Sequence, residues 1–81
     1  MKIVNYILPV RDADVKAIKA MLKKEGFSFS DREYAYFSSK RERLHVTIYE
    51  RGPKALVQGN EAKAFIKSTL KPFLTEITKK G

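Results

Sequence analysis

The distribution of hydrophobic and polar residues along the chain predicts five strands and two helices. Residues 43–51, RLHVTIYER, alternate: Leu44, Val46 and Ile48 are apolar, and the residues between them are polar, aromatic or basic. A period of two indicates a strand with one face on a core and the other face elsewhere. Similar short runs predict further strands at residues 2–8, 27–30, 34–40 and 54–59.

Residues 12–26 predict the first helix. Asp12 or Asp14 can cap its start, and Gly26 can end it. Its apolar residues recur at helical spacing, which places them on one stripe. The stripe consists of Val15, Ile18, Met21 and Leu22.

The second helix is predicted to begin after Asn60, its candidate cap. Pro72 lies inside the helical pattern, so we expect a kink or a break near Thr69. The apolar stripe of this helix consists of Phe65, Ile66, Leu70, Phe73, Leu74 and Ile77.

The resulting order, β-α-β-β-β-β-α, predicts an α+β fold with a five-stranded antiparallel sheet. Four consecutive strands with short connections form a meander. Each helix has one apolar stripe and the sheet has one apolar face, so both helices should cover that face and leave the other open. A chain of 81 residues has room for one such domain, residues 1–81.

The open face collects the outward residues of the alternating strands. Residues 43–51 contribute Arg43, His45, Thr47, Tyr49 and Arg51, and residues 54–58 contribute Lys54, Leu56 and Gln58. If Ala35 and Phe37 face the helices, the preceding strand adds Tyr34, Tyr36, Ser38 and Lys40. Cations can meet phosphates, and hydroxyl, imidazole and amide groups can meet sugars and base edges. Taken singly, these residues are also explained as good strand formers or as a solvated surface.

Charge and composition narrow the range of functions that this chain can have. The chain has 17 Lys and Arg against 9 Asp and Glu, a net charge of +8, which favours a polyanionic partner. It has no cysteine and one histidine, so we expect no catalytic residues, no metal site and no cofactor in this domain. The absence of cysteine is compatible with a reducing compartment, and we expect a cytoplasmic protein without membrane attachment.

The stretch AYFSSKRERLHVTIYERGPKALVQGNEAKAF, from Ala35 to Phe65, resembles the N-terminal domain of bacterial ribonuclease HIII, which is similar to one repeat of the TATA-box-binding protein. The matching pieces are VTIYERGPKALVQGN and the helix after it. Ala35, Phe37 and Lys40 also stand where that family tends to have an alanine, a phenylalanine and a lysine.

This resemblance implies a substrate-binding domain that grips an RNA/DNA hybrid with its open sheet face, beside a covalently linked ribonuclease H catalytic domain. The positions that map onto the family's binding face are Lys40, His45, Thr47, Tyr49, Lys54 and Gln58. Other duplex nucleic acids stay open as ligands. The alternative is a protein-interaction module that uses the same face, because tyrosines, Leu56 and a few arginines also suit a protein interface.

Overall fold

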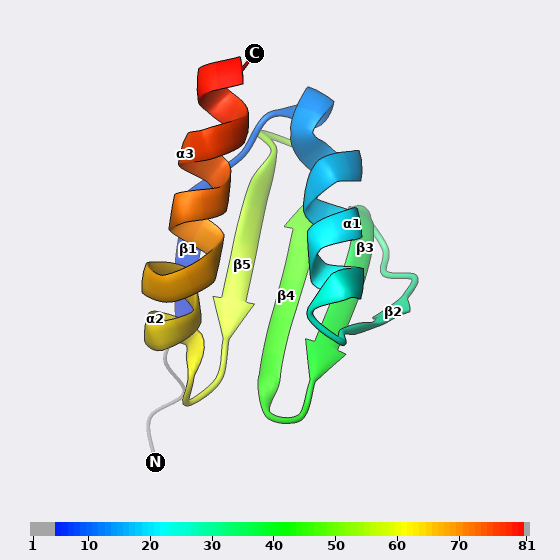
Figure 1. Cartoon of the computed structure of the whole chain (residues 1–81). Helices are drawn as coiled ribbons and strands as arrows, with labels where there is room; N and C mark the ends of the chain where they lie inside the picture. The colour runs from blue at the N-terminus through cyan, green and yellow to red at the C-terminus, as the bar shows by residue number, and fades with distance from the viewer. Residues whose placement is uncertain (1–4, 81) are drawn as a thin grey trace.

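The computed structural model describes residues 5–80 and confirms the five-stranded α+β architecture (Figure 1). The strands are β1 (Asn5–Pro9), β2 (Ser28–Ser30), β3 (Ala35–Arg41), β4 (Leu44–Tyr49) and β5 (Lys54–Gln58). The helical segments are the 3-10 turn η1 (Asp12–Asp14), α1 (Val15–Lys24), α2 (Ala62–Phe65), the π-helical turn η2 (Ile66–Leu70) and α3 (Lys71–Lys80). Residues 2–4 of the predicted first strand lie outside the described residues.

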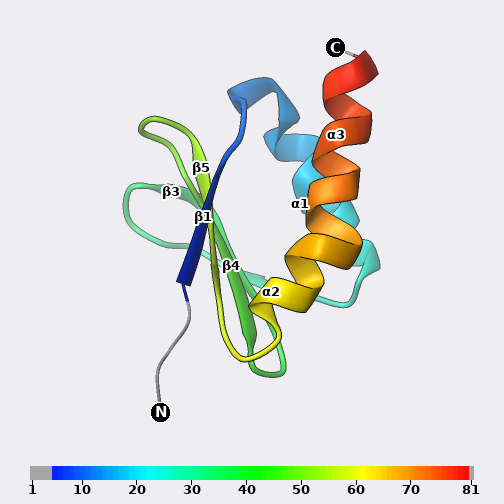
Figure 2. The same cartoon turned by 90° about the vertical axis from the view of Figure 1, so that its left-hand side faces the viewer.

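The strands pair in the order β1-β5-β4-β3-β2, and every pairing is antiparallel. Strands β2 to β5 form the predicted meander, and β1 completes the sheet at the free edge of β5. Seen along the sheet, both helices lie on the same side and leave the opposite face uncovered (Figure 2). The prediction of one covered face and one open face is therefore confirmed.

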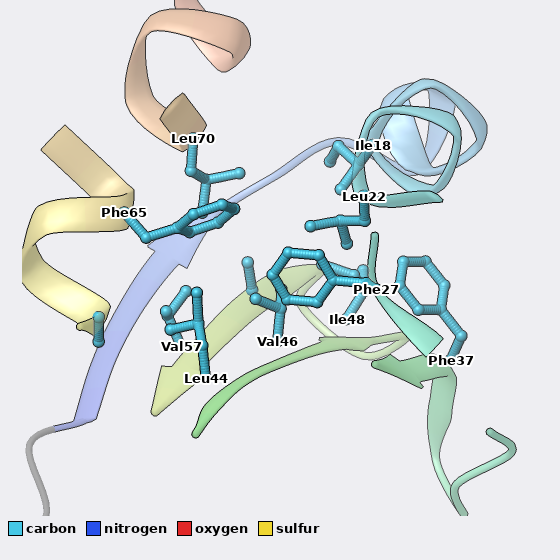
Figure 3. Close-up of a cluster of buried hydrophobic side chains, with 12 residues drawn as sticks. Ile18, Leu22, Phe27, Phe37, Leu44, Val46, Ile48, Val57, Phe65 and Leu70 are labelled. Carbon is cyan, nitrogen blue, oxygen red and sulfur yellow. The ribbon is translucent and has the colours of Figure 1, made fainter. Parts of the chain in front are cut away.

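The core lies between the helices and the covered face of the sheet (Figure 3). Leu44, Val46 and Ile48 of β4 are buried there, as the alternation predicts. Ile18 of α1 and Leu70 of η2 reach them from the two helices and are also fully buried. Burying a side chain of this size contributes about 1.5–3 kcal/mol relative to leaving it exposed, so these contacts fix which face of the sheet points to solvent.

The end of α1 follows the sequence expectation, whereas its start does not. The N–H of Gly26 bonds to Lys23 O at 3.1 Å and that of Phe27 to Leu22 O at 3.0 Å, with Gly26 at φ +88°. These bonds and the left-handed glycine satisfy the last carbonyls of the helix. Asp14 occupies the cap position but makes no side-chain capping bond, because its carboxylate accepts from Arg11 Nε at 2.6 Å.

The second helix is interrupted where Pro72 predicts it. The turn η2, which contains Thr69, is π-helical and directly precedes α3, whose second residue is Pro72. Proline lacks an N–H and its ring clashes with the carbonyl four residues earlier, and a wider turn accommodates both effects. The predicted cap is wrong: Glu61, not Asn60, precedes α2, and no side chain caps that helix, whose first turn begins with the bond from Ala62 N–H to Gly59 O.

Candidate nucleic-acid interface

The antiparallel register arranges the open-face side chains in three cross-strand rows. The first row is Ser28, Lys40, His45, Gln58 and Asn5. The second is Ser30, Ser38, Thr47, Leu56 and Ile7, and the third is Ala35, Tyr49, Lys54 and Pro9. The structure thus brings Lys40, His45 and Gln58 together at one end of the face, and Tyr49 and Lys54 at the other.

The two predicted arginines lie outside the strands. Arg43 is exposed in the two-residue turn between β3 and β4. Arg51 is exposed in the connection between β4 and β5, and it borders the same surface hollow as Tyr49 and Lys54. Arg51 therefore adds a second cation at the Lys54 end of the face, while Arg43 stands at the tip of the β3–β4 turn.

Thr47 lies in the centre of the open face but is covered by its neighbours. Its side chain is 1% exposed, and its hydroxyl lies 3.1 Å from that of Ser38 on the adjacent strand. Leu56, directly opposite it on β5, is half-buried. In this arrangement Thr47 stabilises the sheet surface, and the neighbouring side chains are the ones that a ligand would meet first.

A hollow of about 330 Å³ lies at the Lys54 end of the face. Its walls are apolar and aromatic, with two cations at the rim, and consist of Ile7, Tyr34, Tyr49, Leu56, Arg51 and Lys54. Ile7 is 63% exposed and Tyr34 is 75% exposed. Sequence reasoning missed Ile7, because only the pairing of β1 with β5 places it opposite Leu56. Large exposed apolar and aromatic side chains around one hollow indicate a binding surface.

Tyr34 reaches this hollow from a strained backbone conformation. It is the third residue of a turn closed by the bond from Ala35 N–H to Arg32 O, and its φ is +65°. Turns that need a positive φ at this position normally use glycine or asparagine. A bulky aromatic residue at positive φ is an outlier of the kind that collects at functional sites.

A second hollow, also of about 330 Å³, lies at the opposite end of the face beside β2. The hydroxyls of Ser28, Ser30 and Ser38 border it, together with Lys40 and His45. Hydroxyl donors beside a lysine are typical partners of phosphate oxygens. The alternation of residues 27–30 contains these serines, but their outward direction becomes clear only from the pairing of β2 with β3.

The sequence-based expectation that Tyr36 lies on the open face of the third strand is wrong. The register of β3 shifts between Ala35 and Phe37, so Ala35 pairs with Tyr49 on the open face while Phe37 is buried on the other. Tyr36 turns away from the open face, and its hydroxyl donates to Asp12 at the start of η1. This hydrogen bond is the main reason that the pKa of Tyr36 is raised, with burial and the charges of Asp12 and Glu50 adding to it.

The charged side chains within the strands all have the same sign. The five described strands contain no acidic residue, and their outward lysines are Lys40 and Lys54. Within residues 5–80, no three side chains of His, Asp and Glu gather into a possible metal site. Among the same residues, no helix is long and apolar enough to cross a membrane.

Comparison with known proteins adds one result. No protein-family model matches the chain, and no curated protein matches it. A similar solved structure is the crystal structure of Aquifex aeolicus RNase H3, with a TM-score of 0.72 and 20% sequence identity. The match covers 85% of this chain and 26% of that one, so this chain spans about a quarter of that protein's length. The chain therefore has a fold that is found within RNase H3.

Proposed function

We propose that this chain is a non-catalytic domain that binds RNA/DNA hybrids with its open sheet face, as the substrate-binding part of a ribonuclease HIII. The observation that carries the proposal is the open face itself, which has Lys40 at one end, Lys54 beside the aromatic hollow at the other end, and no carboxylate in its strands. The RNase H3-like fold supports the proposal, as does the resemblance in sequence. The parent protein would carry the ribonuclease H catalytic domain in the same chain.

The dimensions of the face favour a wide, shallow groove. Five strands at a spacing of about 4.8 Å make it about 19 Å across, and the rows from His45 to Tyr49 extend about 13 Å along the strands. This surface is wider than the major groove of B-DNA, at about 12 Å, so the flat sheet cannot enter that groove. The minor groove of an A-like duplex is wide and shallow and displays the 2′-hydroxyls of its RNA strand.

In this proposal each hollow binds a different strand of the duplex. The serine hollow, with Lys40 and His45, takes a backbone phosphate of one strand. The aromatic hollow takes a sugar of the other strand against Tyr34 and Tyr49, with Lys54 and Arg51 on the flanking phosphates. Gln58, whose amide donates to Asn5 Oδ1 at 3.2 Å, lies beside His45 at the serine-hollow end of the face and presents its remaining amide groups to the groove edge there.

The test measures hybrid affinity against salt concentration for the wild type and three variants. For Lys40→Gln/Lys54→Gln we expect the slope of log K against log salt to become shallower by about two units, because each lysine releases about one counterion. Lys54→Arg, which keeps the charge, should retain the wild-type slope. Tyr49→Ala should lower the affinity by about 1 kcal/mol and leave the slope unchanged. A double variant with the wild-type slope would contradict the proposed face.

The proposal also requires that the chain alone does not cleave its ligand. We expect no cleavage of an RNA/DNA hybrid with magnesium or manganese present, because the described residues contain no cluster of carboxylates for metal-assisted hydrolysis. Asp31 and Glu33, close together in the turn before β3, are the acidic residues to check. Cleavage that is lost in Asp31→Asn would overturn the non-catalytic assignment.

A protein-interaction module is the second candidate. The exposed side chains of Ile7 and Tyr34 beside Leu56 favour it, since a contiguous apolar patch is typical of a protein interface. The salt experiment separates the two functions. A hybrid affinity that is negligible at low salt, or a slope near zero, would favour the protein partner.

A further inference from the structure

The excess positive charge of the chain lies in its helices. The segments α1, α2, η2 and α3 contain nine lysines and one acidic residue, Glu76, a net charge of +8. The whole chain, with 17 basic and 9 acidic residues, also has a net charge of +8, so the residues outside these segments hold eight of each sign. The helices cover the face of the sheet opposite the candidate interface (Figure 2).

The lysines of the second helix form a regular row. Lys63, Lys67, Lys71 and Lys79 are all exposed and stand at multiples of four residues. Residues four apart are neighbours on an α-helix, about 6 Å apart along its axis, so this row extends over at most about 24 Å and winds gradually around the helix. On α1, the exposed lysines are Lys16, Lys19, Lys23 and Lys24.

The spacing of the row on the second helix does not itself stabilise that helix. Neighbouring lysines four residues apart repel each other. Within residues 5–80, the ion pairs are Arg11–Asp14 and Arg41–Glu25, and neither includes one of these exposed lysines. Their charges are therefore available to an external anion.

Two lysines of this row border a surface hollow whose side chains could bind a phosphate. Lys71, Thr75, Thr78 and Lys79 border it together with Leu74, and its volume is about 340 Å³. The Thr75 hydroxyl donates to Lys71 O at 2.9 Å, which leaves its oxygen lone pairs and the Thr78 hydroxyl at the surface. Two ammonium groups and a hydroxyl donor are a typical set of contacts for a backbone phosphate.

We propose that the outer surface of the helical layer is a second phosphate-binding surface, which engages the backbone of a further duplex while the open sheet face holds the first. The second surface rests on the first being the hybrid-binding face. A nucleic-acid backbone fits an extended row of like charges, because it is itself a regular polyanion. An anionic membrane fits less well, since the apolar stripes of both helices are used in the core and leave no apolar face for insertion.

The experiment asks whether one protein connects two duplexes. An RNA/DNA hybrid is immobilised, saturated with the full chain and washed, and a fluorescent second hybrid is then added. We expect the wild type to retain the second hybrid, and Lys63→Gln/Lys67→Gln/Lys71→Gln/Lys79→Gln to lose it while still binding the immobilised one. Retention by the wild type should fall with salt at a slope of roughly three to four units, from four lysines at about 0.9 per phosphate.

The matched control replaces the same four lysines by arginine, which keeps the charge and should keep the second hybrid. Thermal unfolding of both variants checks that they are folded. Retention of the second hybrid by the glutamine variant, or none by the wild type, overturns the second surface and leaves the sheet face intact. Loss of the first hybrid in the glutamine variant, with wild-type binding by Lys40→Gln/Lys54→Gln, overturns both proposals.

A parallel arm uses phosphatidylserine vesicles at the same salt concentration. We expect the four lysine-to-glutamine changes to affect hybrid retention more than vesicle binding. If they abolish vesicle binding and leave hybrid retention unchanged, the helical layer is a membrane surface and the proposal is wrong.

Discussion

The strained conformation of Tyr34 allows folding and binding to be separated by one substitution. Tyr34→Gly removes an aromatic side chain that is 75% exposed and relieves a φ of +65°. Relief of a left-handed conformation in a non-glycine residue contributes about 1–2 kcal/mol. The greater freedom of glycine in the unfolded chain costs about 0.5–1 kcal/mol, and the small buried fraction of the ring adds about 0.5 kcal/mol to that loss.

These contributions nearly cancel, so we expect the free energy of unfolding to stay within about 1 kcal/mol of the wild type. Binding should respond differently, because the exposed ring is a wall of the aromatic hollow. Loss of one stacking contact lowers hybrid affinity by about 1 kcal/mol, which is roughly fivefold in Kd. Chemical unfolding and hybrid titration of the same sample measure both quantities.

Tyr34→Phe is the matched control, since it keeps the ring and the strained backbone. It should bind almost as the wild type does and should not gain stability. Two results would refute the reasoning. Wild-type affinity in Tyr34→Gly would show that the ring does not contact the hybrid. A loss of stability beyond about 2 kcal/mol would show that the ring packs into the fold.

Three further predictions concern the fold. Ile48→Ala should cost about 2–5 kcal/mol of unfolding free energy because Ile48 is fully buried, whereas Tyr49→Ala should leave the domain folded. The opposite result in chemical unfolding would show that the buried and open faces of β4 are assigned the wrong way round. Gly59→Ala should cost about 1–3 kcal/mol in the same assay, since its Cβ would lie 2.1 Å from Arg43 O at a φ of +126°; unchanged stability would contradict this contact. The raised pKa of Tyr36 means that its hydrogen bond stabilises the fold fully below pH 10.0 and that this stabilisation is lost as the pH rises through the raised value. Tyr36→Phe should therefore have a lower melting temperature than the wild type at neutral pH and approach it in alkali. A difference that stays constant with pH would argue against the bond.

Local patterns along the chain predicted the order of the elements and the buried sides of β4 and of both helices. The alternation of residues 44–49 predicted the inward Leu44, Val46 and Ile48, because a side-chain period of two leaves no other way to bury them. Gly26 and Pro72 marked the end of α1 and the interruption of the second helix for reasons of backbone geometry alone. The net charge likewise depends only on composition.

Only the tertiary structure decided what the open face offers and where the charge lies. Pairing of β1 with β5 brings Ile7 to a hollow that also contains Tyr34, and a shift of register within β3 turns Tyr36 toward Asp12. Thr47 is outward by alternation yet covered by its neighbours. These outcomes depend on contacts between residues distant in sequence, which no local period encodes. Because helices and sheet form separate layers, a total charge of +8 that composition assigns to the whole chain is concentrated on the helical side.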